Sequence, residues 1–166
     1  MADSNYIFCP LCTTKLVEKH IYDAQRQTCP ACGFINFLEP KLVAVVVVEY
    51  QGAFLLGRRS MDPGNGMWSF VGGYVNRGEK VEEAAIREVK EETNLDVQLD
   101  HLIGVYSERG NPNVVIAYQA SICNGDISNM APQENEVSEL AFFSLQEMPE
   151  LAFPVDEHIK RGIRRR

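Results

Sequence analysis

The chain has 166 residues, 45% of them hydrophobic, which suits one domain of ordinary size with a packed core and a small appendage. Its formal net charge of −7 and its sequence pI of about 5.0 argue against a broad basic surface that grips duplex nucleic acid. The longest apolar run, residues 42–48, is too short to span a membrane, and no N-terminal stretch has the pattern of a secretory signal. We therefore expect a cytoplasmic protein without a membrane partner.

The first forty residues contain four of the five cysteines, in two Cys-x-x-Cys pairs: Cys9 with Cys12, and Cys29 with Cys32. Each pair lies in a tight turn, "CPLC" or "CPACG", that points two thiolates at one ion. Two such turns supply the four ligands of a structural Zn²⁺, and the segment is too short to build an apolar core of its own. Residues 1–40 therefore resemble a zinc ribbon, and two pairs of buried or redox-active thiols are the alternative.

After Pro40 the pattern changes to that of an α/β domain, residues 41–166. The run "LVAVVVVEY" (42–50) is β-branched and nearly continuous, so it predicts a strand that is buried on both faces. The order of elements is strands, helix, strands, helix, which indicates a mixed sheet covered on two sides. The further strands are expected at 53–59, 68–75, 96–108, 113–123 and 138–145, and the helices at about 79–93 and within 146–166.

The first predicted helix gathers negative charge, with six glutamates against three basic side chains in residues 79–92. At about 100° per residue, Glu88, Glu91 and Glu92 share a sector that borders the apolar stripe, whereas Arg87 falls on the solvent side. Three carboxylates beside a packed face need a positive partner, and Mg²⁺ prefers such oxygen ligands. The helix therefore predicts a divalent cation site, with a solvated, salt-laced surface helix as the alternative.

The stretch "GGYVNRGEKVEEAAIREVKEETNL" (72–95) closely resembles the Nudix box. In that box a Gly, five residues, a Glu and seven residues precede Arg-Glu-apolar-any-Glu-Glu-any-Gly-apolar. Only Asn94 departs, where the box has its second glycine, and Asn suits a left-handed helix cap. The resemblance covers about residues 41–155 and implies the α/β/α sandwich of the Nudix hydrolases, preceded here by the zinc ribbon.

The resemblance implies an activity and roles for the residues of the box. Nudix hydrolases cleave a nucleoside diphosphate linked to another group, with the help of Mg²⁺ or Mn²⁺ ions. It implies that Arg87 orients Glu79 by a bidentate pair. It also implies that the ions are held by the carbonyl of Gly73 and by the carboxylates of Glu88, Glu91 and Glu92. A general base comes from the box or from the later acidic loop, where we single out Glu136 and Glu139; solvated loop acids are the alternative.

The resemblance leaves several substrates open. Compact ADP-ribose and FAD pyrophosphatases resemble this chain, as do, more distantly, NADH pyrophosphatases, whose Ser-Gln-Pro-Trp-Pro-Phe-Pro segment is missing here. We expect hydrolysis of such a small-molecule nucleotide to a nucleoside monophosphate. Arg58 and Arg59 are candidates for contacts with phosphate, with surface arginines as the alternative. Aromatic candidates for stacking on a base, with plain core residues as the alternative, are Phe70, Tyr74, Tyr106, Tyr118 and Phe153.

Three other functions remain open on the sequence. Two are enzymatic, the cleansing of oxidised nucleoside triphosphates and the removal of RNA caps. The third is a regulator without catalysis that senses a nucleotide or binds nucleic acid, and the intact glutamates of the helix argue against it. A homodimer is expected from the same resemblance.

Overall fold

The computed structural model describes residues 6–163, and the chain divides into two compact units, residues 1–40 and residues 41–166. In the first unit, β1 (Val17–Ile21) pairs with β2 (Ala24–Thr28) as an antiparallel hairpin between the two cysteine pairs. The apolar core of this unit is very small: Cys9, Leu16 and Cys29, with Phe34 packed against them. So small a core needs a further source of stability, such as a metal.

The second unit is built on a seven-stranded sheet. Its strands are β3 (Lys41–Tyr50), β4 (Ala53–Arg59), β5 (Trp68–Ser69), β6 (Val71–Tyr74), β7 (Val97–Ser107), β8 (Asn113–Ile122) and β9 (Val137–Phe143). The order is β5-β4-β3-β8-β7, with β6 also on β3 and β9 also on β4. Only β3 and β8 run parallel, so the sheet is mixed, as predicted.

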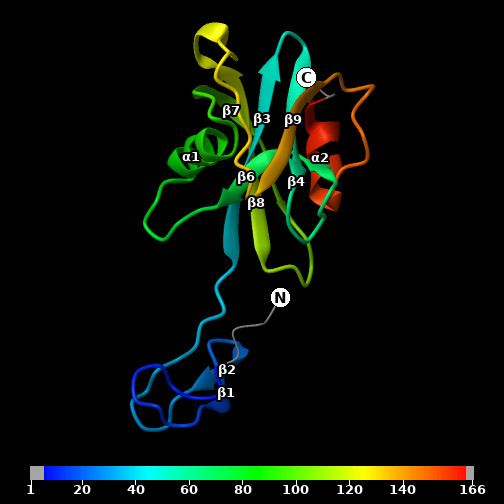
Figure 1. Cartoon of the computed structure of the whole chain (residues 1–166). Coiled ribbons are helices and arrows are strands. Elements are labelled where there is room, and N and C mark those ends of the chain that lie inside the picture. Colours follow the sequence, from blue (N-terminus) through cyan, green and yellow to red (C-terminus); the bar gives the residue numbers. More distant parts are fainter. Residues whose placement is uncertain (1–5, 164–166) are drawn as a thin grey trace. The chain divides into compact units, whose positions relative to one another are not determined.

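Two helices cover opposite faces of this sheet, which gives the predicted α/β/α sandwich (Figure 1). On one face α1 (Val81–Thr93) packs against Val46 and Val48. On the other face α2 (Pro154–Ile163) packs against Val45 and Val47. Alternate side chains of β3 therefore enter two different cores, which explains why its sequence is apolar without a break.

One edge of β3 is shared between two strands. Residues 43–46 pair with β6, and residues 49–50 pair with β4. The predicted strand 68–75 is consequently two short strands, because β5 pairs with β4 and β6 crosses to β3. This crossing brings the Gly-Gly pair of β6 beside the glutamates of α1.

Helix α1 begins two residues later than predicted. Lys80 is its N-cap, with the extended dihedral angles φ −75° and ψ 144°, and Glu79 therefore lies in the preceding loop. A short 3-10 helix, Cys123–Gly125, follows β8, between the predicted strands 113–123 and 138–145. Neither of the two described α-helices has the length and apolar character that crossing a membrane requires.

Candidate active site

The two glycines of β6 allow two different close approaches. A Cβ atom on Gly72 would lie 2.2 Å from the carbonyl oxygen of Ala44 in β3, and one on Gly73 would lie 2.4 Å from the carboxylate of Glu88 in α1. No side chain fits at either position without displacing its neighbour. Gly72 therefore lets β6 lie close to β3, and Gly73 creates the space in which a carboxylate of α1 meets the backbone of β6.

Arg87 forms the centre of the polar network. Its Nε and Nη2 donate to the two oxygens of Glu79, at 2.7 and 3.0 Å, and its Nη1 donates to Glu88 at 2.7 Å and to Glu91 at 2.9 Å. Its Nη2 also donates to the carbonyl of Tyr74 at 3.2 Å. This arrangement lowers the pKa of Glu79 to about 2, chiefly through the hydrogen bonds from Arg87 and then from the backbone of Asn76.

The prediction that Arg87 points to solvent is wrong. An angle around a helix axis gives the direction of Cβ, but the long arginine side chain bends back over the neighbouring turn and is only 27% exposed. Part of the negative charge on α1 is thus compensated within the chain itself. Among the three predicted metal ligands, Glu92 is the one that Arg87 does not bind.

Glu92 is buried, like Glu88. Glu88 and Glu92 are each only 8% exposed, whereas the Glu91 side chain is 52% exposed. Glu92 accepts one hydrogen bond, from the Gly72 N–H at 3.3 Å. Burial raises its pKa to about 8; the Gly72 N–H opposes this shift and the charges of Glu88 and Glu136 add to it. Burial also raises the pKa of Glu88, against the opposing effect of Arg87.

By the chemistry of its oxygen atoms the donor set fits a hard divalent cation, although Glu88, Glu91 and Glu92 are not gathered as closely as the cysteines of the first unit. Glu92 is buried with one backbone partner, and the missing Cβ of Gly73 leaves room beside the Glu88 carboxylate. Carboxylate and carbonyl oxygens are the ligands that Mg²⁺ and Mn²⁺ take in proteins. One guanidinium nitrogen of Arg87 bridges Glu88 and Glu91, and each of these carboxylates keeps a second oxygen for a cation.

The two candidates for the general base have different surroundings. The charge of Glu136 contributes to the raised pKa of both Glu88 and Glu92, after the larger effect of burial. Glu139 instead lies on β9 and forms an exposed ion pair with Arg58, with Nη1 and Oε2 3.4 Å apart. We therefore keep Glu136 as the first candidate for the general base.

The two candidate arginines at the end of β4 also differ. Arg58 donates from Nε to the carbonyl of Gly66 at 3.0 Å, in addition to its pair with Glu139. Arg59 donates to the carbonyl of Pro63 at 2.7 Å, and its guanidinium lies 4.9 Å from the ring centroid of Phe153. The charge of Arg59 contributes to lowering the pKa of Glu92, so Arg59 is the first of the two arginines to test as a phosphate ligand.

Few of the candidate aromatic side chains are free to stack on a base. Phe70 is 4% exposed in the core on the α2 side, and Tyr106 packs against the same core. Tyr118 donates its hydroxyl to Glu82 at 3.2 Å. Tyr74 is 46% exposed, with Lys41 Nζ 5.3 Å from its ring centroid, so its ring can still stack on a base. Phe153 stays a second candidate.

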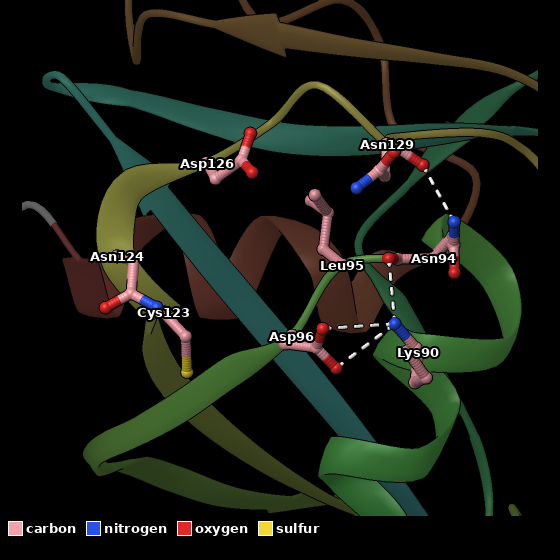
Figure 2. A pocket seen from close by; sticks show the side chains of 8 residues that line it. All are labelled: Lys90, Asn94, Leu95, Asp96, Cys123, Asn124, Asp126 and Asn129. Atoms are coloured by element: carbon pink, nitrogen blue, oxygen red, sulfur yellow. Dashed lines mark hydrogen bonds and ion pairs between the residues drawn. The ribbon is translucent and has the colours of Figure 1, made fainter.

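The end of α1 shows how Asn94 replaces the glycine of the box (Figure 2). Asn94 has φ 58°, and its backbone N–H donates to the carbonyl of Lys90. Its side-chain amide donates to the carbonyl of Asn129 at 2.9 Å. Lys90 in turn binds the Asn94 carbonyl and Asp96. The polar cavity of about 250 Å³ in Figure 2 surrounds this cap, and none of the box glutamates lines it.

The four predicted zinc ligands lie together in the first unit. The Sγ atoms of Cys9, Cys12, Cys29 and Cys32 are all within 4.8 Å of one another, and no other such group occurs in residues 6–163. Zn–S bonds of about 2.3 Å at tetrahedral angles would separate the sulfurs by about 3.8 Å. The Thr14 hydroxyl and amide lower the pKa of the Cys12 thiol to about 6, which favours the thiolate that a metal binds. The cluster is thus consistent with a zinc ribbon.

Two hydrogen bonds of the site could not be predicted from the sequence. The Gly72 N–H is the partner of Glu92, and the Tyr74 carbonyl is a partner of Arg87. Both are backbone groups, and a side-chain pattern gives no direct signal for them. The Gly-Gly pair was the available signal, since it marks a close approach of the backbone to another group.

Comparison with known proteins is consistent with this site. The family model described as the NUDIX domain matches residues 39–165. A protein named ADP-ribose pyrophosphatase, from Methanocaldococcus jannaschii, is 33% identical over 133 residues, covering 77% of this chain and 76% of that protein.

Other relatives extend further along this chain. A protein named NAD-capped RNA hydrolase NudC, from Pseudomonas aeruginosa, is 31% identical over 159 residues, or 94% of this chain, but this covers only 53% of that protein. The chain thus spans about half the length of these NudC relatives. The crystal structure of a NUDIX hydrolase from Nitrosomonas europaea superposes with a TM-score of 0.89 at 28% identity, covering 97% of this chain and 92% of that one.

Proposed function

The chain belongs to the Nudix family of hydrolases, enzymes that act on pyrophosphate bonds, and from this premise we propose that it cleaves an ADP-ribose, FAD or NADH type of nucleoside diphosphate derivative and releases a nucleoside monophosphate. The observation that carries the proposal is the pair of buried carboxylates, Glu88 and Glu92, against the glycines of β6. The name of the Methanocaldococcus relative supports ADP-ribose as the first substrate to test.

The site residues divide the work of the reaction between them. Glu88, Glu91, Glu92 and the Gly73 carbonyl would hold Mg²⁺ or Mn²⁺, which when bound neutralises phosphate oxygens and lowers the pKa of water. Arg87 holds Glu79 and keeps the loop before α1 against the site. Arg59, whose charge contributes to lowering the pKa of Glu92, is suited to a phosphate oxygen of the substrate.

We assign the general base to Glu136, which would take the proton of the attacking water. We expect Glu136→Gln to lower kcat by about 10²-fold or more, because a positioned base contributes on that scale. Glu139→Gln is the matched control, since it removes a carboxylate from the same segment that is paired with Arg58, and its kcat should stay within a few fold of wild type. Equal losses in both variants would contradict the assignment.

A second candidate substrate is RNA that carries a dinucleotide cap. The observation that favours it is the extent of the NudC match, which at 94% of the chain includes most of the first unit as well as the second. The whole activity of those longer relatives is not transferred to this chain by a match over half their length.

A substrate panel tests the proposal. The full chain is incubated with ADP-ribose, FAD, NADH, a diadenosine polyphosphate, 8-oxo-dGTP and NAD-capped RNA, each with Mg²⁺ and with Mn²⁺, and the products are separated by chromatography. We expect AMP as a product from ADP-ribose, FAD or NADH at the highest kcat/KM. Preferred cleavage of 8-oxo-dGTP would assign the cleansing function instead, and no turnover of any compound would favour a regulator.

Three expectations beyond the reaction stay predictions. A structural Zn²⁺ in the ribbon is tested by metal analysis of the purified chain. A homodimer is tested by light scattering at working concentration. The cytoplasmic location is tested by imaging the tagged protein in its own cell.

A further inference from the structure

The first unit exposes an unusual aromatic surface at the tip of its hairpin. Tyr22 and Phe37 are 74% and 50% exposed, and their rings are nearly parallel, with an interplanar angle of 20° and centroids 6.5 Å apart. The guanidinium of Arg26 lies 5.3 Å from the centroid of Phe37. The surface thus combines two flat rings and a flat cation.

The backbone holds Tyr22 in an unfavourable conformation. Ile21 and Ala24 are the last pair of the hairpin, and the two residues between them, Tyr22 and Asp23, have φ 48° and φ 62°. A two-residue turn of this kind strongly prefers Asn-Gly, and a bulky aromatic residue with positive φ is rare. Arg26 fastens the turn by donating to the carbonyls of Ile21 and Tyr22. Folding alone does not favour a tyrosine here, which points to a use for its ring.

A small polar pocket shares Arg26 with this surface, although neither ring lines it. It has a volume of about 220 Å³, and its polar lining includes Gln25, Gln27, Asn36 and the acid Glu18. The Gln27 amide oxygen already accepts a hydrogen bond from Asn36 at 3.0 Å. The volume is below that of typical sites for drug-sized ligands, and the primary amides can both donate and accept hydrogen bonds.

We propose that this surface of the ribbon, defined by Tyr22, Phe37, Arg26 and the adjoining pocket, binds an unpaired nucleobase of single-stranded RNA. Bases stack on aromatic rings and on arginine planes, and side-chain amides read their exposed edges. A protein partner would also cover an apolar surface, but two nearly parallel exposed rings with a flat cation beside them favour a base. Base binding would serve the reaction only if capped RNA is a substrate, so this part of the proposal rests on the second candidate of the proposed function.

The charge of the ribbon predicts how such binding responds to salt. Residues 1–40 carry three basic residues (Lys15, Lys19, Arg26) against four acidic ones. Contacts with phosphate are therefore few, and stacking supplies the affinity. We expect modest affinity with a shallow dependence on salt, unlike that of proteins that neutralise many phosphates.

The test measures binding of a short fluorescein-labelled RNA, which lacks a pyrophosphate, to the full zinc-loaded chain by fluorescence anisotropy. The double variant Tyr22→Asn with Phe37→Ala removes both rings, while Asn suits the turn with positive φ. We expect its Kd for single-stranded RNA to rise at least about fivefold, the loss of one stacked base. Leu11→Ala, equally exposed at 74% on the same unit, is the control and should leave Kd unchanged.

Further readouts separate this proposal from the proposed function. The double variant should keep its zinc content and its kcat on ADP-ribose, while its KM for capped RNA rises. Failure to hydrolyse ADP-ribose, FAD and NADH would refute the proposed function and would leave the RNA-binding proposal standing. The base-binding proposal is overturned if wild type does not bind the RNA, if duplex RNA binds equally well, or if the double variant binds like wild type. Loss of an oligomer in light scattering with unchanged RNA affinity would assign the rings to self-association instead.

Discussion

At the scale of single residues, the site depends on two buried carboxylates that lack full compensation. Glu88 shares Arg87 with two other glutamates, and Glu92 has only one backbone N–H. Buried carboxylates of this kind are costly in an apolar surrounding unless a cation joins them. The protein keeps them in spite of that cost, which is typical of a functional site.

We expect Glu92→Gln to lower kcat by orders of magnitude while the fold stays intact. The amide is nearly the same size and still accepts the Gly72 N–H, but it carries no charge to hold a cation. The measurement is steady-state turnover of ADP-ribose with Mg²⁺, together with circular dichroism at matched concentration. Glu83→Gln, on the exposed side of the same helix, is the control. Unchanged turnover in the Glu92 variant would refute the metal assignment.

Gly73→Ala tests the close approach of β6 to α1. The added methyl group would lie 2.4 Å from the Glu88 carboxylate, so that side chain must move. We expect Mn²⁺ affinity, followed by electron paramagnetic resonance, to fall about 10-fold or more, a scale typical when the support of a metal ligand is disturbed. Wild-type Mn²⁺ affinity in this variant would show that Glu88 does not ligate from its present position.

The sequence identified the glutamates of the site but misjudged the charge around them. Spacing fixes the side of a helix from which a side chain leaves, so the burial of Glu88 and Glu92 could be anticipated. The path of a long, flexible side chain such as Arg87 depends on which partners lie within its reach. Glu136 could be named as a candidate from the sequence, but its surroundings in the fold could not be predicted, because the loop before β9 has no periodic pattern.

At the scale of elements, α2 carries a buried acid at its first turn. Asp156 is 2% exposed, and its carboxylate accepts the Phe153 N–H at 3.3 Å. Burial raises its pKa to about 7, against the opposing effects of that N–H and of Arg59. Between pH 3.8 and about pH 7, Asp156 therefore keeps its proton in the folded state and has lost it in the unfolded chain.

This raised pKa predicts how stability changes with pH. An acid with a raised pKa in the fold makes the free energy of unfolding fall as pH rises from about 4 to about 7, after which the loss is complete. Asp156→Asn keeps the acceptor oxygen and removes the titration. We expect the variant to match wild type near pH 4 and to be more stable at pH 8 by a few kcal/mol, because each tenfold change in proton affinity is worth about 1.4 kcal/mol. Urea unfolding at both pH values measures this.

A matched control separates the buried acid from a general change of charge. Glu150→Gln removes an exposed carboxylate a few residues before α2 and should leave the pH profile of wild type unchanged. Parallel profiles for wild type and Asp156→Asn would show that Asp156 does not hold its proton in the fold.

The elements themselves were largely predictable, and their errors have physical causes. The predicted strand 53–59 agrees with β4 at both ends, because turn residues bound its apolar run. The segment 68–75 was predicted as one strand because local pattern cannot show that neighbouring residues pair with different strands. Helix α1 starts after Glu79 because that carboxylate serves Arg87 and the loop backbone instead of the helix.

At the scale of the whole molecule, the two units differ in what stabilises them. The second unit has two apolar cores, one on each face of the sheet, whereas the core of the first consists of little more than two of its own cysteines. Domains as small as the first depend on metals or disulfides. The two units should therefore respond separately to removal of metal.

We expect a zinc chelator to release about one Zn²⁺ per chain and to expose the first unit to protease, because four thiolates form one closed site. Cleavage should fall within residues 6–40, and the fragment that contains the sheet should resist digestion. Mass spectrometry of the digest and a colorimetric zinc assay measure the two effects. An equally resistant N-terminal unit after chelation, or no zinc released, would refute the ribbon assignment.

The resemblance of the box predicted the fold class more securely than it predicted chemistry beyond the box. The spacing of glycine, arginine and glutamates is long enough to specify a family, and the family brings its sandwich with it. The candidates for substrate contact include Tyr74, at a variable position of the box, and Arg59, which precedes the box, and their neighbours come from distant segments. Such neighbours are set by tertiary structure, and no local pattern encodes them.

The parallel pairing of β3 with β8 has a consequence for synthesis on the ribosome. The apolar run of β3 leaves the exit tunnel early, but its partner lies much later in the chain, at Asn113–Ile122. Throughout that interval the edge of β3 that β8 later covers stays unpaired on the nascent chain, and such an edge can aggregate or recruit chaperones. The first unit, which ends at Pro40, leaves the exit tunnel before β3 and can fold earlier.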